Sequence, residues 1–199
     1  MTSPSHAPFH TTRAPRHMVA SADGLATQAG MHMLERGGNA VDAAIATNAA
    51  IAVTGPHLCG MGGDLFALVH HQGRVECLNA SGRSGSAADA AAVRADGHSV
   101  MPFRHDIRTV TVPGCVDGWV ALHQRFGSLP LSTLLAPAIR LASEGFPASP
   151  LLVGSIGGEI LGHVFDPDGE AVLPWSGVRR LALVTLASGV TVMVNPYGW

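Results

Sequence analysis

From residue 25 onward, apolar residues recur three and four positions apart, which predicts an amphipathic helix over residues 22–36. Ser21 or Asp23 can cap the start of this helix, and Gly37 can end it. Gln28 and Glu35 then face outward. The apolar face consists of small and medium side chains: Leu25, Ala26, Ala29 and Met33.

A second helix is predicted over residues 40–53, and it consists almost entirely of alanine and other small residues. The glycine pair at 37–38 can adopt left-handed backbone conformations that close the first helix. Asn39 then suits the N-cap of the second helix, and Asp42 suits its positive N-terminal end. Because its side chains are so small, we expect this helix to lie buried at the centre of the fold, with a neighbour packed very close to its backbone.

Alternating patterns over residues 64–71 and 74–79 predict two strands joined by a tight turn at Gln72–Gly73. The first strand is apolar on both faces, so we expect it to be covered on both sides. One face carries Leu65, Ala67 and Val69, and the other carries Phe66 and Leu68.

A small-residue loop at 80–86 follows, with one cation, Arg83. We expect a short alanine-rich helix over 87–94 and a strand over 110–112 that runs into the Pro113–Gly114 turn.

Two further helices are predicted, over 116–126 and 131–143. Ser132 is a candidate N-cap for the second of them, and Pro137 should kink it or separate a short turn from the helix proper. The first of them is amphipathic, with one side formed by Trp119, Leu122 and Phe126.

The chain divides into three parts. Residues 1–17, rich in Pro, Ser, Thr and His, predict a disordered leader, and residues 18–152 contain the regular elements. Residues 153–199 differ in composition, and their Gly-rich and Asp-Pro-Asp-Gly stretches predict loops at 154–158 and 166–169. A second hairpin is expected there, formed by residues 181–186 and 190–194.

Composition limits the possible functions. Of the 199 residues, 47% are hydrophobic and only 13% are charged. So few charged side chains cannot cover the solvent-exposed surface of an ordinary monomer. We therefore expect that much of the surface is buried against another chain, or that the sequence is a piece of a larger protein. The net charge of −2, with no basic patch, argues against a nucleic-acid partner or a membrane surface.

No metal or cofactor is expected. The three cysteines, Cys59, Cys77 and Cys115, form no C-x-x-C pair, and the 11 histidines are scattered. The glycines at 60–63 precede a strand and no Gly-Lys-Ser/Thr follows them, so they fit neither a phosphate loop nor a dinucleotide-binding turn. With no signal-peptide core and no apolar run of transmembrane length, the cytoplasm is the predicted compartment.

Six motifs between Met18 and Leu152 give the chain a family resemblance. In order they are MVAS (18–21), GGNAVDAA (37–44), GPHLCGMGGD (55–64), SGR (81–83), TVPG (111–114) and PAIRLASEGFP (137–147). In sequence and order they resemble the start of the large subunit of γ-glutamyltransferases, which are N-terminal-nucleophile hydrolases. The resemblance covers about two thirds of the chain.

The resemblance implies a mixed α/β (α+β) fold, part of a four-layer αββα sandwich. It also implies a precursor that cleaves itself into a large and a small subunit. The substrate class is a γ-glutamyl compound such as glutathione, and the acyl-enzyme forms on an N-terminal threonine of the small subunit. Such a threonine carries its own α-amino group as general base.

By the same resemblance, Arg83 corresponds to the arginine that binds the α-carboxylate of the substrate. A guanidinium is a planar, permanently charged fork that matches a carboxylate. The residues that follow, Ser84–Gly85–Ser86, differ from the usual pattern of the family. The resemblance therefore does not decide which acyl group the substrate carries.

No catalytic residue is assigned in this chain. The threonine pair Thr11–Thr12 lies at the wrong end of the fold, and Thr185 and Thr191 lie in apolar strand-like runs, so none is taken as the nucleophile. The complementary small subunit would supply it. Two alternatives stay open: a truncated, non-catalytic remnant that only binds a ligand or partner, and a relative that acts as a β-lactam acylase.

Overall fold

The computed structural model describes residues 14–102 and 106–164 of the chain. The predicted hairpin at 181–194 and the loop at 166–169 lie outside these residues, as does most of the predicted leader. The described helices and strands are, in order, α1 (Gly24–Glu35), α2 (Ala40–Thr54), β1 (Leu65–His71), β2 (Arg74–Ala80), α3 (Ala90–Ala95), a 3-10 turn (Ile107–Thr109), α4 (Cys115–Phe126), α5 (Leu131–Glu144) and α6 (Pro150–Val164).

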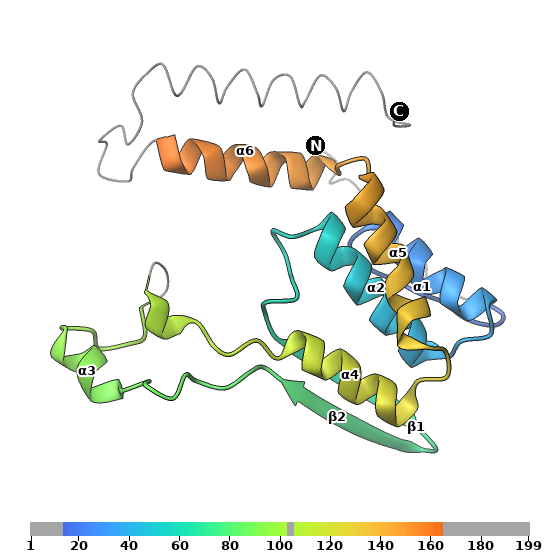
Figure 1. The fold of residues 1–199 in the computed structure, drawn as a ribbon, viewed down its shortest axis with the longest axis horizontal. Coiled ribbons are helices and arrows are strands. Elements are labelled where there is room, and N and C mark those ends of the chain that lie inside the picture. Colours follow the sequence, from blue (N-terminus) through green and yellow to red (C-terminus); the bar gives the residue numbers. More distant parts are fainter. Residues whose placement is uncertain (1–13, 103–105, 165–199) are drawn as a thin grey trace, which may run out of the picture.

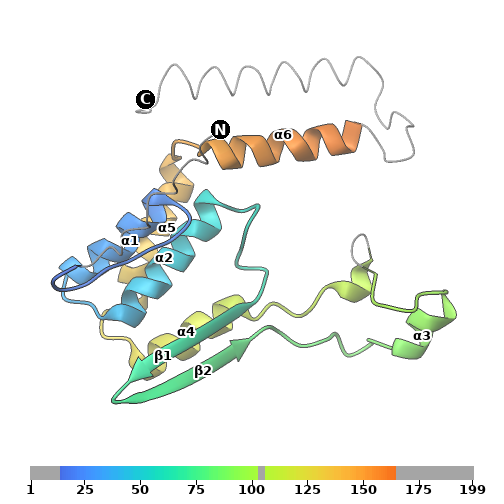
Figure 2. The same cartoon turned by 180° about the vertical axis from the view of Figure 1, so that it is seen from behind.

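The elements form layers on one side of a two-stranded hairpin. Helix α4 lies along the hairpin, α2 contacts α4, and α1 and α5 pack against α2 (Figures 1 and 2). Helix α3 projects away from these layers at the far end of the two segments that leave β2 and enter α4. None of the described helices combines the length and the hydrophobicity that crossing a membrane needs.

The hairpin is antiparallel and has the predicted turn, with Leu68 opposite Cys77. Its inner face, which includes Leu65, Val69 and Leu78, packs against the core that contains Trp119 and Leu122 of α4. The outer face stays open within the described part of the chain: the side chains of Phe66, Leu68 and Val75 are 63%, 75% and 68% exposed. The expectation that β1 is covered on both faces is therefore wrong for these residues, because α4 and the helices that pack behind it lie against the inner face alone.

Helix α2 is the slim central helix that the alanine pattern predicts. A Cβ atom added to Gly30 of α1 would lie 2.1 Å from Oγ1 of Thr47 and 3.0 Å from the carbonyl oxygen of Ala43. The two helices thus approach so closely that a methyl group does not fit between them. The predicted apolar face of α1 is confirmed for Ala26, Ala29 and Met33, which are buried, whereas Leu25 is half-buried.

The helix ends around the glycine pair follow the prediction in part. Gly37 has φ = +85°, and the N–H groups of Gly37 and Gly38 donate to the carbonyls of Leu34 and Met33, which closes α1 as a Schellman motif. Asn39 caps α2 through its side chain. Of the two glycines, only Gly37 has a positive φ.

The structure corrects three local predictions before residue 153. Helix α5 is continuous through Pro137, and Pro130, not Ser132, occupies its N-cap position. Asp23 caps α1, which decides between the two candidates. The strand predicted at 110–112 reduces to a single bridge between Val112 and Arg83, because no further backbone pairing continues it.

The loop predicted at 154–158 is wrong, because this segment belongs to helix α6. The Oγ atom of Ser149 accepts the N–H of Leu152 at 3.2 Å, and the carbonyl of Ser149 accepts the N–H of Val153. Serine at the N-cap followed by proline at the first helical position is a strong helix start. This start and the apolar residues around the glycines outweigh the low helix propensity of glycine.

Candidate functional site

Arg83 lies in the loop that follows β2, with its side chain exposed. Its backbone is held in place, because the N–H of Val112 donates to the carbonyl of Arg83 at 2.8 Å, and the two residues form an antiparallel bridge. The segment before α4 therefore anchors the loop that carries the guanidinium, although the two are far apart in sequence.

Two glycines permit this contact. Gly82 has φ = +83°, and a Cβ there would lie 2.0 Å from the carbonyl oxygen of Val112. A Cβ on Gly114 would lie 2.2 Å from the carbonyl oxygen of Ala80. Any side chain at either position would push the Arg83 loop away from the start of α4.

The glycine run before β1 reaches the same place. The carbonyl of Gly63 accepts the N–H groups of Gly114 and Cys115, each at 3.1 Å. Three sequence motifs, at 55–64, 81–83 and 111–114, are thus joined by backbone contacts at one end of the hairpin. The structure brings together segments whose proximity the sequence does not indicate.

A hollow of about 620 Å³ opens beside Arg83. Its walls come from the end of β2, the Arg83 loop, the segment 112–114 and one face of α4. Two of the residues that line it are charged, Arg83 and Asp117, and their charges are opposite. Such a site can bind a small polar ligand through charge-assisted hydrogen bonds.

Sequence reasoning missed Asp117. The available signal was its position in the first turn of α4, on a face shared with small residues at spacings of three and four: Gly114, Gly118 and Ala121.

Cys115, the first residue of α4, has no features of an activated nucleophile. A helix N-terminus lowers the pKa of a thiol. Here burial raises the pKa of Cys115, and the nearby Cys59 and Asp64 raise it further. The thiol is buried beside Asn48, whose Oδ1 atom also accepts the indole N–H of Trp119 at 2.8 Å. Cys115 is therefore a packing residue.

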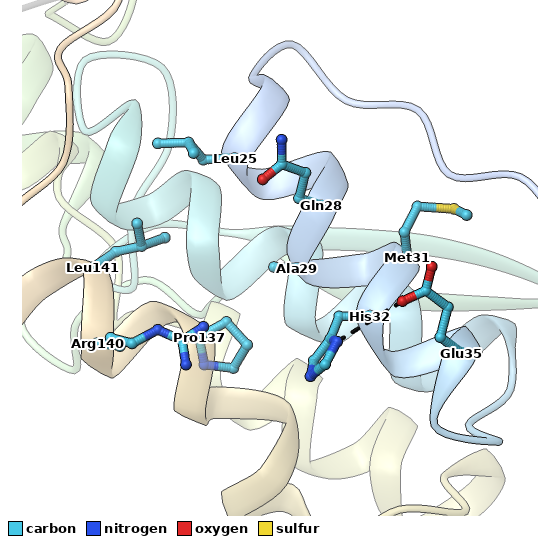
Figure 3. Close-up of a pocket in the computed structure, with 9 residues that line it drawn as sticks. All are labelled: Leu25, Gln28, Ala29, Met31, His32, Glu35, Pro137, Arg140 and Leu141. Carbon is cyan, nitrogen blue, oxygen red and sulfur yellow. Dashed lines mark ion pairs between the residues drawn. The ribbon is translucent and has the colours of Figure 1, made fainter. Parts of the chain in front are cut away.

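A second hollow, of about 500 Å³, lies between α1 and α5, away from Arg83 (Figure 3). His32 and Glu35 point toward each other there at 3.9 Å, and Arg140 lies beside Pro137 on the facing helix. The side chains of His32 and Glu35 are 51% and 64% exposed, so solvent screens their ion pair. Nothing in this arrangement activates a nucleophile or binds a substrate group.

No group of His, Cys, Asp and Glu side chains within residues 14–102 and 106–164 could hold a metal ion. The threonines considered and rejected as nucleophiles, Thr11, Thr12, Thr185 and Thr191, lie outside the described residues.

Comparison with known proteins gives a consistent picture. The Glutathione hydrolase-like YwrD proenzyme of Bacillus subtilis is 44% identical over 136 residues, which are 67% of this chain and 26% of that protein. The Acylase ACY 1 proenzyme of Pseudomonas sp. (strain V22) is 36% identical over 167 residues, which are 79% of this chain and 30% of that protein.

Among solved structures, the gamma-glutamyltranspeptidase from Pseudomonas nitroreducens complexed with L-DON matches with a TM-score of 0.68 and 28% identity. The match covers 87% of this chain and 55% of that chain, so the mixed helix and sheet fold corresponds to part of this N-terminal-nucleophile hydrolase fold.

This chain spans about a quarter of the length of the curated relatives, 26% and 30% in these two cases. The family model of gamma-glutamyltranspeptidase matches residues 26–165. The chain belongs to the gamma-glutamyltranspeptidase family.

Proposed function

We propose that this chain is the N-terminal part of the large subunit of a γ-glutamyltransferase or glutathione hydrolase. It would supply the helix layers, the hairpin and Arg83, and a complementary small subunit would supply the threonine nucleophile. The observation that carries the proposal is the position of Arg83, exposed and anchored through Val112 at the rim of a hollow, in a chain of this family.

In this proposal Arg83 binds the α-carboxylate of a γ-glutamyl compound such as glutathione and fixes the position of the γ-carbonyl. The threonine hydroxyl attacks that carbonyl, and its own α-amino group takes the proton and passes it to the leaving amine. The resulting acyl ester is then cleaved by water or by an acceptor amine. Without the threonine, the chain alone would be inactive.

The test uses the assembled enzyme, in which this chain is joined to the rest of the large subunit and to a threonine-bearing small subunit, and measures release of p-nitroaniline from γ-glutamyl-p-nitroanilide. We expect Arg83→Ala to raise KM on the order of 30-fold, since removing one partner of a charge-assisted contact costs about 2 kcal/mol or more. Arg74→Ala is the matched control: this arginine is exposed at the other end of β2. An unchanged KM in Arg83→Ala would contradict the role of Arg83.

A β-lactam acylase is the second candidate, and it is favoured by the 36% identity to an acylase proenzyme. Turnover of an acylated β-lactam without turnover of the γ-glutamyl anilide would support it. An assembled protein that binds γ-glutamyl compounds but turns over neither substrate would indicate the non-catalytic remnant.

We also propose a reducing, cytoplasmic compartment. Cys59, Cys77 and Cys115 are all free thiols in the described structure, which is consistent with this proposal. Cell fractionation of the native protein checks it.

A further inference from the structure

We propose that Ile107, Val110 and Val112 form a surface on which the threonine-bearing small subunit docks. These residues belong to the arm, which we define as residues 84–102 and 106–112, the part of the chain that connects the loop after β2 to the start of α4. The inference rests on the proposed function, because it takes the threonine-bearing subunit as the occupant of this surface.

The arm has little support from the helix layers. Helix α3 has no extensive contact with any other described helix or strand, and Figures 1 and 2 show it projecting away from them. Within the described residues of the arm, only the side chain of Val93 is buried. Because every ordered residue loses conformational entropy, one buried side chain cannot hold a segment of this length in one conformation. We therefore expect another part of the protein to cover the arm.

The exposed apolar side chains of the arm begin at the hollow beside Arg83. Val112 lines that hollow and is 55% exposed. Val110 lies two positions earlier in extended backbone, so the two valines share a face, and Val110 is 61% exposed. Its N–H donates to the carbonyl of Ile107, whose side chain is 81% exposed. The three side chains thus form an apolar surface that continues from the wall of the hollow onto the arm.

The turn that carries Ile107 is held rigidly. The neighbouring guanidinium of Arg108 donates to the carboxylate of Asp106 through Nε at 2.9 Å and Nη2 at 2.5 Å. Its Nη1 atom donates to Asp96, at the end of α3, at 2.6 Å. Charge-assisted bonds to two carboxylates fix the 3-10 turn against the end of α3. A side chain presented by a fixed turn loses little freedom on binding, which suits Ile107 as an anchor of an interface.

The position of the surface identifies its occupant. In the proposed mechanism the threonine hydroxyl has to come within about 3 Å of a carbonyl bound beside Arg83. The polypeptide that carries this threonine must therefore cover the rim of the hollow, which includes Val112, and beyond this rim it meets Val110 and Ile107. This chain spans 26% and 30% of two relatives described as proenzymes, so the rest of such a protein is large enough to supply the contact.

The first experiment identifies the neighbour of Ile107 directly. The photoreactive residue p-benzoylphenylalanine replaces Ile107 in the assembled enzyme, and after irradiation the joined peptides are identified by mass spectrometry. We expect position 107 to be joined to a peptide of the small subunit. Position 139 is the control, because Ile139 is 63% exposed on α5, away from the arm, and should give no such adduct. Adducts of position 107 with the rest of the large subunit alone, or with no peptide, overturn the inference.

The second experiment measures how firmly the small subunit is held. The assembled enzyme is bound through a tag on the large subunit, and release of the small subunit is followed as urea is raised. We expect Ile107→Asp and Val110→Asp to release it at a lower urea concentration than the wild type, and Ile139→Asp to behave like the wild type. Where an aspartate variant does not assemble, Ile107→Ala removes the apolar contact without adding a charge. Unchanged release in all variants of the arm overturns the inference.

The failure of this inference can be distinguished from failure of the proposed function. If position 107 has another neighbour while the assembled enzyme still cleaves γ-glutamyl-p-nitroanilide, the docking surface is wrong and the proposed function stands. If the assembled enzyme cleaves no γ-glutamyl compound, both are wrong.

Discussion

The carboxylate of Asp42 accepts the backbone N–H of Ser128 at 3.1 Å, although 86 positions separate the two residues. It also accepts the hydroxyl of Ser128 and the N–H groups of Asn39 and Leu129. Asn39 adds a contact to the same region, since its side-chain amide donates to the carbonyl of Phe126 at 2.6 Å. The start of α2 is thereby fixed to the connection between α4 and α5.

We expect Asp42→Ala to lower the free energy of unfolding by about 3 kcal/mol, because it removes a fully buried carboxylate and leaves several N–H donors without a partner. Urea unfolding followed by circular dichroism measures the change. Glu144→Gln, which alters an exposed carboxylate, should stay within about 0.5 kcal/mol of the wild type. Equal losses in both variants would contradict this role of Asp42.

Stability should fall in acid partly through Asp42. Burial raises its pKa, but the hydrogen bonds from Ser128, Asn39 and Leu129 outweigh burial, and the pKa lies below the ordinary value of 3.8. Because its pKa is lowered in the folded state, Asp42 contributes its full stabilisation at pH values above the ordinary pKa of the unfolded chain. This stabilisation is lost as the pH falls through the pKa of the folded state.

The difference in unfolding free energy between wild type and Asp42→Asn should therefore shrink as the pH is lowered from about 6 to about 3. Asp106, whose pKa is lowered to about 2 by its hydrogen bonds to Arg108, titrates in the same acid range in both proteins and cancels in the difference. A difference that grows toward low pH would be the opposite of this expectation.

Gly30→Ala should destabilise the fold by about 2 kcal/mol, because the new methyl group would meet Thr47 and the backbone of Ala43 where α1 crosses α2. Gly24→Ala in the same helix is the control, since no atom lies within 4 Å of a Cβ there. It should be neutral or slightly stabilising, because alanine is the better helix former. The two midpoints in urea decide the prediction, which fails if they shift equally.

Gly82→Ala should release the Arg83 loop from the start of α4. The substitution forces an L-residue into φ = +83° and places its Cβ against the carbonyl of Val112. We expect faster hydrogen exchange at the amide of Val112, whose bond to the carbonyl of Arg83 would be lost. Gly85→Ala, in open space on the same loop, should leave that exchange rate unchanged.

Local signals in the sequence predicted most of the elements correctly. Alternation predicted the hairpin, three- and four-residue spacing predicted α1 and α4, and the side-chain chemistry of Asn39 predicted the cap of α2. These features depend on neighbours within a few residues. The helix α6 was missed although its Ser149–Pro150 start is also a local signal.

By itself, then, the sequence determined most of the helices and the hairpin up to residue 144, the family, and Arg83 as a candidate ligand-binding residue. Only the tertiary structure showed that Val112 and Gly114 press against the Arg83 loop, that Asp117 shares its hollow, and that Asp42 binds Ser128. These relationships join residues distant in the chain. Their physical basis is the close approach of backbones and the pairing of buried polar groups. Such contacts cannot be predicted from the spacing of hydrophobic residues within one element.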